Sequence, residues 1–304
     1  MMKEVAIDGG RCTARLIYGS PNMDVLPTLP ANSVDCVVTS PPYWGLRDYE
    51  DDGQFGLEAT PDAYVEEITK IFREVRRVMK DKGTLWLNLG DTYKNKQLTG
   101  IPWRTAFALQ ADGWILRQEI IWHKPNPMPE SVTDRCTKAS ESIFLFAKSP
   151  RYYFNAQAIR EKNAGPLPYG DKKNFKMNDA RAQGKHGKSS FHSGGTRQEF
   201  IDKYYTNGRN KRSVWSITTQ NFPGAHFAVF PEEIPRLAIL AGCPDEGTVL
   251  DPFSGSGTTG KVALRLGRSY IGIDLNEDYL ELATRRVSPI KSDVVIDDDQ
   301  LEIF

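Results

Sequence analysis

Short apolar runs recur along the chain and are separated by segments with a different spacing of apolar positions. The runs are rich in Val, Ile, Leu and aromatic residues, as is typical of strands buried in a sheet. They lie at residues 14–20, 34–40, 83–90, 116–123, 141–148, 248–253 and 269–274. Together these runs predict a sheet of seven strands.

Helical spacing separates several of these predicted strands. In residues 61–80, Tyr64, Ile68, Phe72 and Val75 recur every three or four positions, which predicts a helix with one buried face. Three further helices are expected at residues 231–242, 258–267 and 276–287. Strands that alternate with helices predict an α/β fold, with a doubly wound, mostly parallel sheet and helices on both faces.

Residues 160–212 interrupt this pattern. They have no helical or strand periodicity and are rich in Gly, Ser and Asn, so we expect an inserted, loop-rich region. The insert carries 13 Lys and Arg against 5 Asp and Glu, whereas the whole chain has 39 of each kind and no net charge. A basic insert with interleaved aromatic residues fits contact with a polyanion. A solvated loop that is simply basic is the equal alternative.

The overall composition is that of a globular protein. The chain has 304 residues, of which 39% are hydrophobic, and a mean hydropathy of -0.47. It has no apolar run of 18 residues and no secretory pattern at its N-terminus, so we expect no membrane partner and a cytoplasmic location. Its four cysteines form no C-x-x-C pair, which argues against zinc, and we expect no metal site.

A glycine-rich turn, DPFSGSGTTGK at residues 251–261, follows one predicted strand. Its glycine spacing matches a dinucleotide turn and nearly matches a P-loop, but Val262 stands where a P-loop has the Ser or Thr that holds magnesium. Asp251 would repel a pyrophosphate and attract a cationic ligand. The next strand ends in Asp274, which is well placed to accept hydrogen bonds from ribose hydroxyls. These features favour an adenosine-containing cofactor with a positive charge.

The position of this turn also constrains the fold. Only 30 residues follow Asp274, so a cofactor-binding domain that began here would have too little chain to complete its sheet. The N-terminal strands must complete it, which predicts a permuted order.

A second motif stands near the N-terminus, where the predicted strand at 34–40 runs into Pro41-Pro42-Tyr43-Trp44. The two prolines fix the chain and leave the carbonyl groups near Ser40 and Pro41 as rigid acceptors beside an aromatic ring. A flipped nucleobase with an exocyclic amine requires such acceptors and a ring on which to stack. A plain turn with packed aromatic rings is the alternative, and the presence of the glycine-rich turn at residues 251–261 in the same chain disfavours it.

The motifs TSPPYW at 39–44 and DPFSGSGTT at 251–259, in that order with a basic region between them, resemble one family. This family is the beta-class, permuted, S-adenosylmethionine-dependent DNA amino-methyltransferases of the S-P-P-Y type. LWLNLGDTY at 85–93, WHKPNPMPESVTDR at 122–135 and HFAVFPEEI at 226–234 match as well. The resemblance implies the seven-stranded methyltransferase fold, with S-adenosyl-L-methionine as cofactor.

The resemblance also implies roles for individual residues. The residues expected to hold the target base are Ser40, Pro41, Pro42 and Tyr43. The residues expected to bind the cofactor are Asp251, Pro252, Phe253, Ser254, Gly255, Gly257, Thr258, Asp274, His226 and Phe230. For Phe230, packing against the following helix is an equal alternative. Trp122 and Lys124 approach the DNA or the target base in one interpretation, and in the other Trp122 is packed at a strand end.

The expected organisation is one methyltransferase domain with an insert. Residues 1–154 and 216–290 form the domain, residues 155–215 form a target-recognition insert, and residues 291–304 form an acidic tail. The cations expected to contact double-stranded DNA are Lys172, Lys173, Lys176, Arg181, Lys185, Lys188, Arg197, Arg209, Lys211 and Arg212. A cognate restriction endonuclease is a candidate partner, and a monomer and a homodimer both remain open.

The reaction implied is methyl transfer to an exocyclic amine of a flipped base, directly and in line. The cysteines lack the Pro-Cys context of ring-carbon methyltransferases, so no covalent enzyme intermediate is expected. Ser at the first position of S-P-P-Y is commoner among family members that act on cytosine N4, which is our first hypothesis. Adenine N6 is the second, and a non-catalytic DNA-binding protein is the third.

Overall fold

A computed structural model describes residues 2–46, 53–163, 208–219 and 230–288. The chain divides into two compact units, one of residues 1–155 and 212–304 and the other of residues 156–211. In the smaller unit, η2 (Gln157–Ile159) precedes Glu161, which pairs through its backbone with Arg209. The boundaries expected for the insert and the tail stay predictions, and the tail lies outside the described residues.

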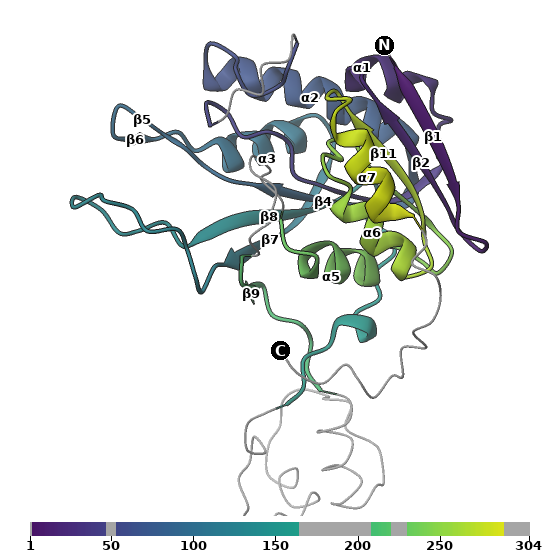
Figure 1. The fold of residues 1–304 in the computed structure, drawn as a ribbon. Helices are drawn as coiled ribbons and strands as arrows, with labels where there is room; N and C mark the ends of the chain where they lie inside the picture. Colours follow the sequence, from purple (N-terminus) through teal and green to yellow (C-terminus); the bar gives the residue numbers. More distant parts are fainter. Residues whose placement is uncertain (1, 47–52, 164–207, 220–229, 289–304) are drawn as a thin grey trace, which may run out of the picture. The chain divides into compact units, whose positions relative to one another are not determined.

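The larger unit is built on a nine-stranded sheet in the order β1-β2-β11-β10-β3-β4-β8-β7-β9 (Figure 1). Five neighbouring strands, from β2 to β4 in this order, run parallel, and β7 pairs with β9 in parallel. Strand β8 is antiparallel to both of its neighbours, and β1 is antiparallel to β2. The strands are β1 (Lys3–Asp8), β2 (Thr13–Tyr18), β3 (Val34–Thr39), β4 (Met79–Leu89), β7 (Ile115–His123), β8 (Ser140–Ala147), β9 (Val214–Ser216), β10 (Thr248–Asp251) and β11 (Ser269–Asp274).

Helices cover both faces of this sheet (Figure 1). One face carries α1 (Asn22–Val25), η1 (Leu26–Thr28), α2 (Pro61–Val78) and α3 (Ile101–Ala111). The other face carries α5 (Glu233–Gly242), α6 (Thr258–Arg265) and α7 (Tyr279–Val287). A small hairpin of β5 (Tyr93–Lys94) and β6 (Gln97–Leu98) stands apart from the sheet. The predicted α/β fold with a mostly parallel sheet is therefore confirmed.

All seven predicted strands are present, and two further strands of the nine-stranded sheet were not predicted. Strand β1 lies at the edge of the sheet with no buried residue, and β9 has only three residues. Such short or exposed strands leave little hydrophobic pattern in the sequence. Helix α3 was missed as well, and α2 ends at Val78, where β4 begins directly.

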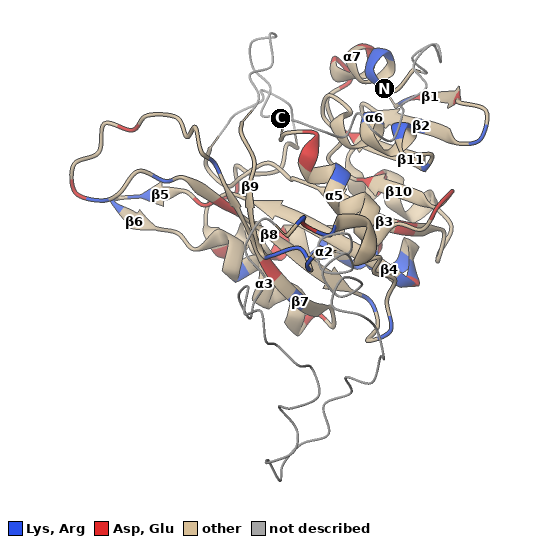
Figure 2. Cartoon of the chain, turned by 90° about the horizontal axis from the view of Figure 1, so that it is seen from below, with Lys and Arg blue, Asp and Glu red and all other residues tan. Residues whose placement is uncertain are grey.

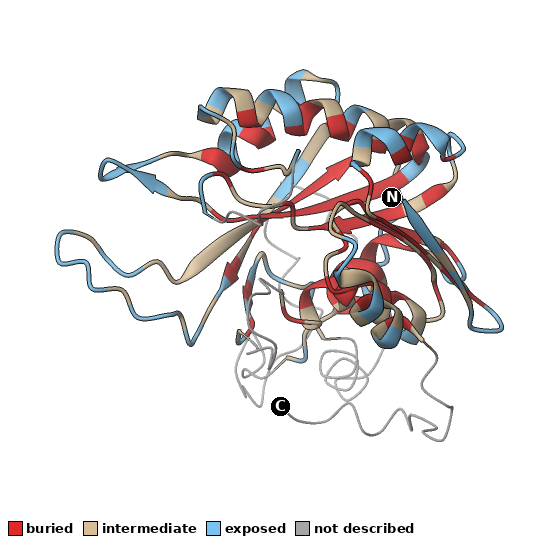
Figure 3. Cartoon of the chain, turned by 45° about the horizontal axis from the view of Figure 1, so that its top comes forward, coloured by how far each residue is buried: buried red, intermediate tan, exposed pale blue. Residues whose placement is uncertain are grey.

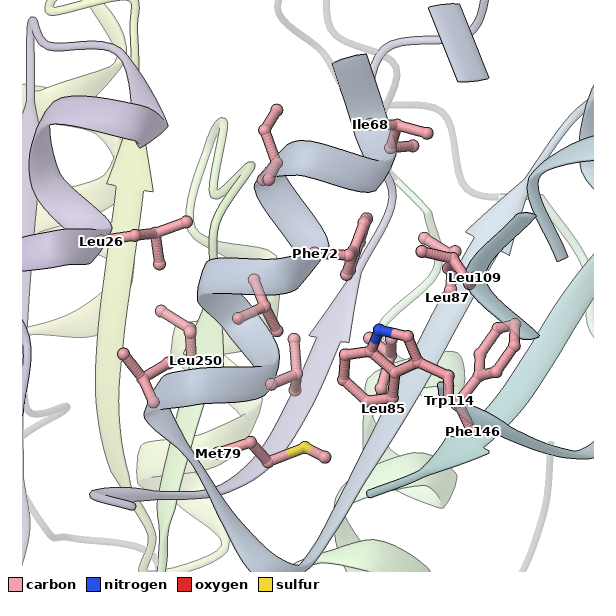
Figure 4. Close-up of a cluster of buried hydrophobic side chains, with 14 of the residues drawn as sticks. Leu26, Ile68, Phe72, Met79, Leu85, Leu87, Leu109, Trp114, Phe146 and Leu250 are labelled. Carbon is pink, nitrogen blue, oxygen red and sulfur yellow. The ribbon is translucent and has the colours of Figure 1, made fainter. Parts of the chain in front are cut away.

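The predicted face of α2 forms the centre of the core. Ile68 and Phe72 are fully buried and point toward Leu85 and Leu87 of β4 (Figure 4). The helix begins as predicted, because the Thr60 hydroxyl accepts a hydrogen bond from the Ala63 amide at 3.1 Å, with Pro61 in the first turn.

The central strands are buried, and exposed residues are gathered on the outer faces of the helices and on the loops (Figure 3). Charged residues of both signs follow the helices and connecting segments, and the central strands carry few (Figure 2). In the part of the chain that the structure describes, no helix is both long and apolar enough to cross a membrane.

Candidate active site

The two sequence motifs meet at one edge of the sheet. Strands β3 and β10 are parallel neighbours, so the S-P-P-Y segment after β3 and the glycine-rich turn after β10 leave the sheet on the same side. A hydrogen bond joins the two motifs directly, because Thr39 Oγ1 donates to Asp251 Oδ1 at 2.6 Å. Residues 212 positions apart thus form one site.

Asp251 is a buried carboxylate that fixes the start of the glycine-rich turn. It accepts hydrogen bonds from the Thr39 hydroxyl, from the Thr259 hydroxyl at 2.7 Å and from the Phe253 amide at 3.1 Å. Burial disfavours its charged form and raises its pKa to about 6, although the three hydrogen bonds act in the opposite direction. The turn therefore holds a carboxylate whose charge a nearby cation would stabilise.

The glycines of the turn leave room beside the backbone. Gly255 has a φ of +48°, and its amide donates to Asp274 Oδ2 at 2.7 Å. A Cβ atom added at Gly255 would have no atom of the described residues within 4 Å. Gly257, with a φ of +76°, stands at the start of α6, where the helix presents unpaired amides. This open space at a helix N-terminus is suited to a ligand.

Two tyrosines that sequence reasoning missed hold the turn from below. The hydroxyl of Ser254 shares hydrogen bonds with those of Tyr18 at 2.7 Å and Tyr270 at 2.8 Å, and Tyr18 donates to the Gly255 carbonyl at 2.8 Å. Burial raises the pKa of both tyrosines well above the ordinary value, so both stay protonated donors. In this structure Ser254 is a support of the turn.

The fit of the turn to an adenosyl cofactor rests on two further groups. Thr258 Oγ1 is buried and, among the described residues, has no hydrogen-bond partner, so a bound ligand can satisfy it. Asp274 lies at the carboxyl end of β11, and besides Gly255 its carboxylate accepts from the Asn276 amide at 3.1 Å. A carboxylate oxygen can accept more than one hydrogen bond, so Asp274 is a candidate acceptor for a ribose hydroxyl.

The S-P-P-Y segment is held rigidly. Pro41 is buried and Tyr43 is partly buried, and the Pro42 carbonyl accepts from the Tyr64 hydroxyl at 3.0 Å. The Tyr43 ring lies against Gly90, where an added Cβ would come within 2.4 Å of the ring. The ring orientation is therefore fixed before any substrate arrives.

A polar cluster that the sequence did not reveal surrounds this segment. The Tyr43 hydroxyl donates to Glu141 Oε2 at 2.6 Å, and Asn88 Nδ2 donates to the Tyr43 hydroxyl, to Glu141 and to Ser40 Oγ. Burial and the Glu141 carboxylate raise the pKa of Tyr43 well above its ordinary value. Lys124 completes the cluster with an ion pair to Glu141. Asn88 Oδ1 is buried and, within the described residues, lacks a partner, as a substrate acceptor would.

The two residues of the WHKPN segment have separate environments. Trp122 is buried and donates from its indole nitrogen to the Ile217 carbonyl at 2.8 Å, which supports the packed alternative. The Lys124 ammonium lies 4.4 Å from the centroid of the Trp122 ring and pairs with Glu141. Phe230 is partly buried directly before Pro231 and α5, and His226 lies outside the described residues.

Seven of the ten predicted DNA-contacting residues belong to the part of the insert that the structure does not describe. Lys172, Lys173, Lys176, Arg181, Lys185, Lys188 and Arg197 lie outside the described residues. Arg209 and Lys211 both pair with Glu161, at 3.1 and 3.6 Å, so part of their charge is already balanced. Arg212 is exposed and belongs to the larger unit.

The chain is similar to known methyltransferases along most of its length. Residues 34–285 match the family model N6_N4_Mtase, described as DNA methylase. The type II methyltransferase M.SmaI of Serratia marcescens is 41% identical over 313 residues, covering 93% of this chain and 94% of the relative. M.Cfr9I of Citrobacter freundii is 40% identical, covering 92% of this chain and 89% of the relative.

Two solved structures share the fold. The cytosine-N4-specific PvuII DNA methyltransferase has a TM-score of 0.65 and 17% identity, covering 91% of this chain and 87% of that chain. M1.HpyAVI in its complex with SAM has a TM-score of 0.53 and 17% identity, covering 91% and 100%. The family model spans both motifs, and the two relatives match this chain over most of the length of both proteins. This chain therefore belongs to the N6/N4 DNA methylase family.

Proposed function

We propose that this protein is a type II DNA methyltransferase that transfers a methyl group from S-adenosyl-L-methionine to the exocyclic N4 of cytosine in duplex DNA. The observation that carries the proposal is the hydrogen bond between Thr39 and Asp251, because it joins a base-binding motif to a cofactor-binding motif. The M.SmaI and M.Cfr9I relatives and the SAM complex of M1.HpyAVI support the same reaction class.

The cofactor lies against the glycine-rich turn in this proposal. S-adenosylmethionine supplies an electrophilic methyl group on a sulfonium. The buried charge of Asp251 attracts its cationic part, Thr258 gains a hydrogen-bond partner, and Asp274 accepts from the ribose. The open space beside Gly255 allows this close approach. Phe253 lines the same turn, with its ring centroid 5.7 Å from that of Phe55.

The target base lies against Ser40, Pro41 and Tyr43. Its exocyclic amine shares its lone pair with the ring, so hydrogen bonds from its N–H groups to Ser40 Oγ and the Pro41 carbonyl concentrate electron density on the nitrogen. The nitrogen attacks the methyl carbon in line, the carbon–sulfur bond breaks, and the nitrogen then releases one proton to water. Positioning of the two reactants supplies most of the rate.

The choice of cytosine rests on the Ser at position 40 and on the cytosine-N4 specificity of the PvuII enzyme. Adenine N6 is the second candidate, because the family name covers both reactions. We expect double-stranded DNA as the partner, in the cytoplasm and in a restriction-modification system with a cognate endonuclease.

The test is direct identification of the product. Purified protein is incubated with unmethylated plasmid DNA and S-adenosylmethionine, and the DNA is digested to nucleosides for mass spectrometry. N4-methylcytosine is expected, and Tyr43→Ala should abolish it, whereas Phe107→Ala on the exposed side of α3 should not. Detection of N6-methyladenine would make adenine the target in place of cytosine. The absence of any modified nucleoside would favour a binding role.

A further inference from the structure

The connection from β7 to β8, residues 124–139, begins beside the S-P-P-Y segment. Its first residue, Lys124, pairs with Glu141, which accepts a hydrogen bond from the Tyr43 hydroxyl at 2.6 Å. The Lys124 amide donates to the Ala139 carbonyl at 2.8 Å, which closes the base of the connection. Figure 1 shows it as a teal arm that extends past the ends of both strands. We call residues 124–139 the arm.

The arm is held in place along its length. Lys96 of the β5–β6 hairpin pairs with Asp134 of the arm at 2.8 Å, and the Arg135 guanidinium lies 4.1 Å from the centroid of the Tyr93 ring. Within the arm, Glu130 accepts hydrogen bonds from Arg135 at 2.7 Å and from the Lys138 amide at 3.1 Å. The contacts with the neighbouring hairpin and those within the arm together give the arm a defined course.

An exposed methionine stands on the outward half of the arm. Met128 is 86% exposed, the highest value for a large hydrophobic side chain in the described part of the chain. It stands between Pro127 and Pro129, and Pro125 fixes the chain further back. Asn126 is anchored, because its side-chain oxygen accepts from the Thr219 amide at 2.9 Å. The structure thus presents an apolar side chain to solvent on a stiffened, tethered backbone.

We propose that Met128 is the wedge that enters the DNA stack when the target base is flipped out. This inference rests on the proposed function. A flipped base leaves a gap between its neighbours, and apolar side chains such as Met are suited to fill it. Met128 lies four positions after Lys124, a reach of at most about 14 Å along extended chain, which is comparable to the about 12 Å width of the major groove. Because Glu141 links Tyr43 to Lys124 at the start of the arm, a base held at Tyr43 is within reach of a wedge on the arm.

The test compares two DNA substrates. Wild-type protein first methylates plasmid DNA, and sequencing locates the modified base. Short duplexes are then built around that base, paired either with its normal complement or with an abasic position that removes the pairing. Single-turnover methylation rates are measured for Met128→Ala, for Met128→Leu, which keeps the apolar bulk, and for Met2→Ala, which removes another exposed methionine next to β1 at the opposite border of the sheet.

The wedge predicts a loss that depends on pairing. Met128→Ala should slow methylation of the paired duplex about tenfold. It should slow methylation of the abasic duplex by less than about threefold, because the target base of that duplex is already unpaired. Met128→Leu and Met2→Ala should stay within about twofold of wild type on both. An unchanged rate for Met128→Ala on the paired duplex, or equal losses on both, would overturn the wedge and leave the proposed function intact. Wild-type protein that methylates no DNA would overturn both.

Discussion

Asp251 combines two opposing influences on one carboxyl group. Three hydrogen bonds, from Thr39, Thr259 and Phe253, favour the charged form, whereas burial disfavours it more strongly. The pKa of about 6 lies above the ordinary value of 3.8. Asp251 is therefore mostly charged at pH 7 and mostly protonated at pH 5 in the protein without a ligand.

This titration predicts that the affinity for the cofactor weakens as the pH is lowered from 7 to 5. A bound cation favours the carboxylate and lowers its pKa, so binding below pH 6 must expel a proton from Asp251. At pH 5 about one molecule in eleven has the charged form, and the affinity for S-adenosylmethionine should be about tenfold weaker than at pH 7. Titration calorimetry at the two pH values measures this change. Asp251→Asn should bind S-adenosylmethionine weakly at both pH values. Equal affinities of the wild-type protein at the two pH values would show that the charge of Asp251 does not contribute to binding the cationic cofactor.

Single residues of the site were predictable only where a motif contained them. Ser40, Tyr43 and Asp251 stand in contiguous motifs, whereas Asn88 and Glu141 reach Tyr43 from positions 45 and 98 residues away. Asn88 left one signal, a polar residue within the otherwise apolar run LWLNL. Partnership across such separations depends on which strands are neighbours, and the local pattern does not contain that information.

At the scale of elements, the unit from β10 through α6 to β11 was predicted as a strand, glycine turn, helix and strand, and the structure confirms this order. Strand β9 and helix α3 were not predicted. Strand β9 is short, and the outward side of α3 carries Trp103 and Phe107, so its apolar residues do not mark one buried face. Hydrophobic periodicity finds elements whose one side is buried and overlooks those that depart from it.

Two glycines of this unit offer a matched test of the cofactor turn. Gly255 and Gly267 both have a positive φ, +48° and +71°, and a Cβ at either would meet no described atom within 4 Å. Replacement by Ala should cost each about 1–2 kcal/mol of unfolding free energy, because the backbone conformation disfavours a side chain. Only Gly255→Ala should also weaken S-adenosylmethionine binding, by about tenfold or more, since its methyl group enters the ligand space. Thermal unfolding and calorimetry measure the two effects, and equal affinities would place the cofactor elsewhere.

The whole molecule brings together motifs from opposite ends of the chain. The sequence predicted that N-terminal strands complete the sheet, because too little chain follows Asp274. It did not predict that β3 and β10 are neighbours, which is what places Thr39 against Asp251. Strand order depends on packing among all elements at once, and a pattern read along one dimension does not specify it.

The distribution of charge over the whole chain leads to a prediction for DNA binding. The insert at 160–212 has 13 basic and 5 acidic residues, so it carries an excess of positive charge that the rest of the chain, with an equal excess of negative charge, balances to zero. Lys172, Lys173 and Lys176 lie within it, outside the described residues. If they neutralise phosphates, replacing all three by Ala should weaken DNA binding and reduce the slope of log affinity against log salt by about 2.7, because counterion release scales with the number of contacts.

The control variant removes three lysines from α2 and from the amino end of β4, at the sheet edge opposite to the one that carries both motifs. Lys70, Lys80 and Lys82 belong to α2 and the start of β4, away from the strand ends that carry both motifs. Their replacement by Ala makes the same change in net charge and should leave the salt slope within about 0.5 of wild type. Fluorescence anisotropy with labelled duplex DNA from low to high salt measures both slopes. Cofactor affinity should stay constant in both variants, because the sequence of the glycine-rich turn is unchanged in each. Equal slopes for wild type and the insert variant would exclude these three lysines from the DNA contact.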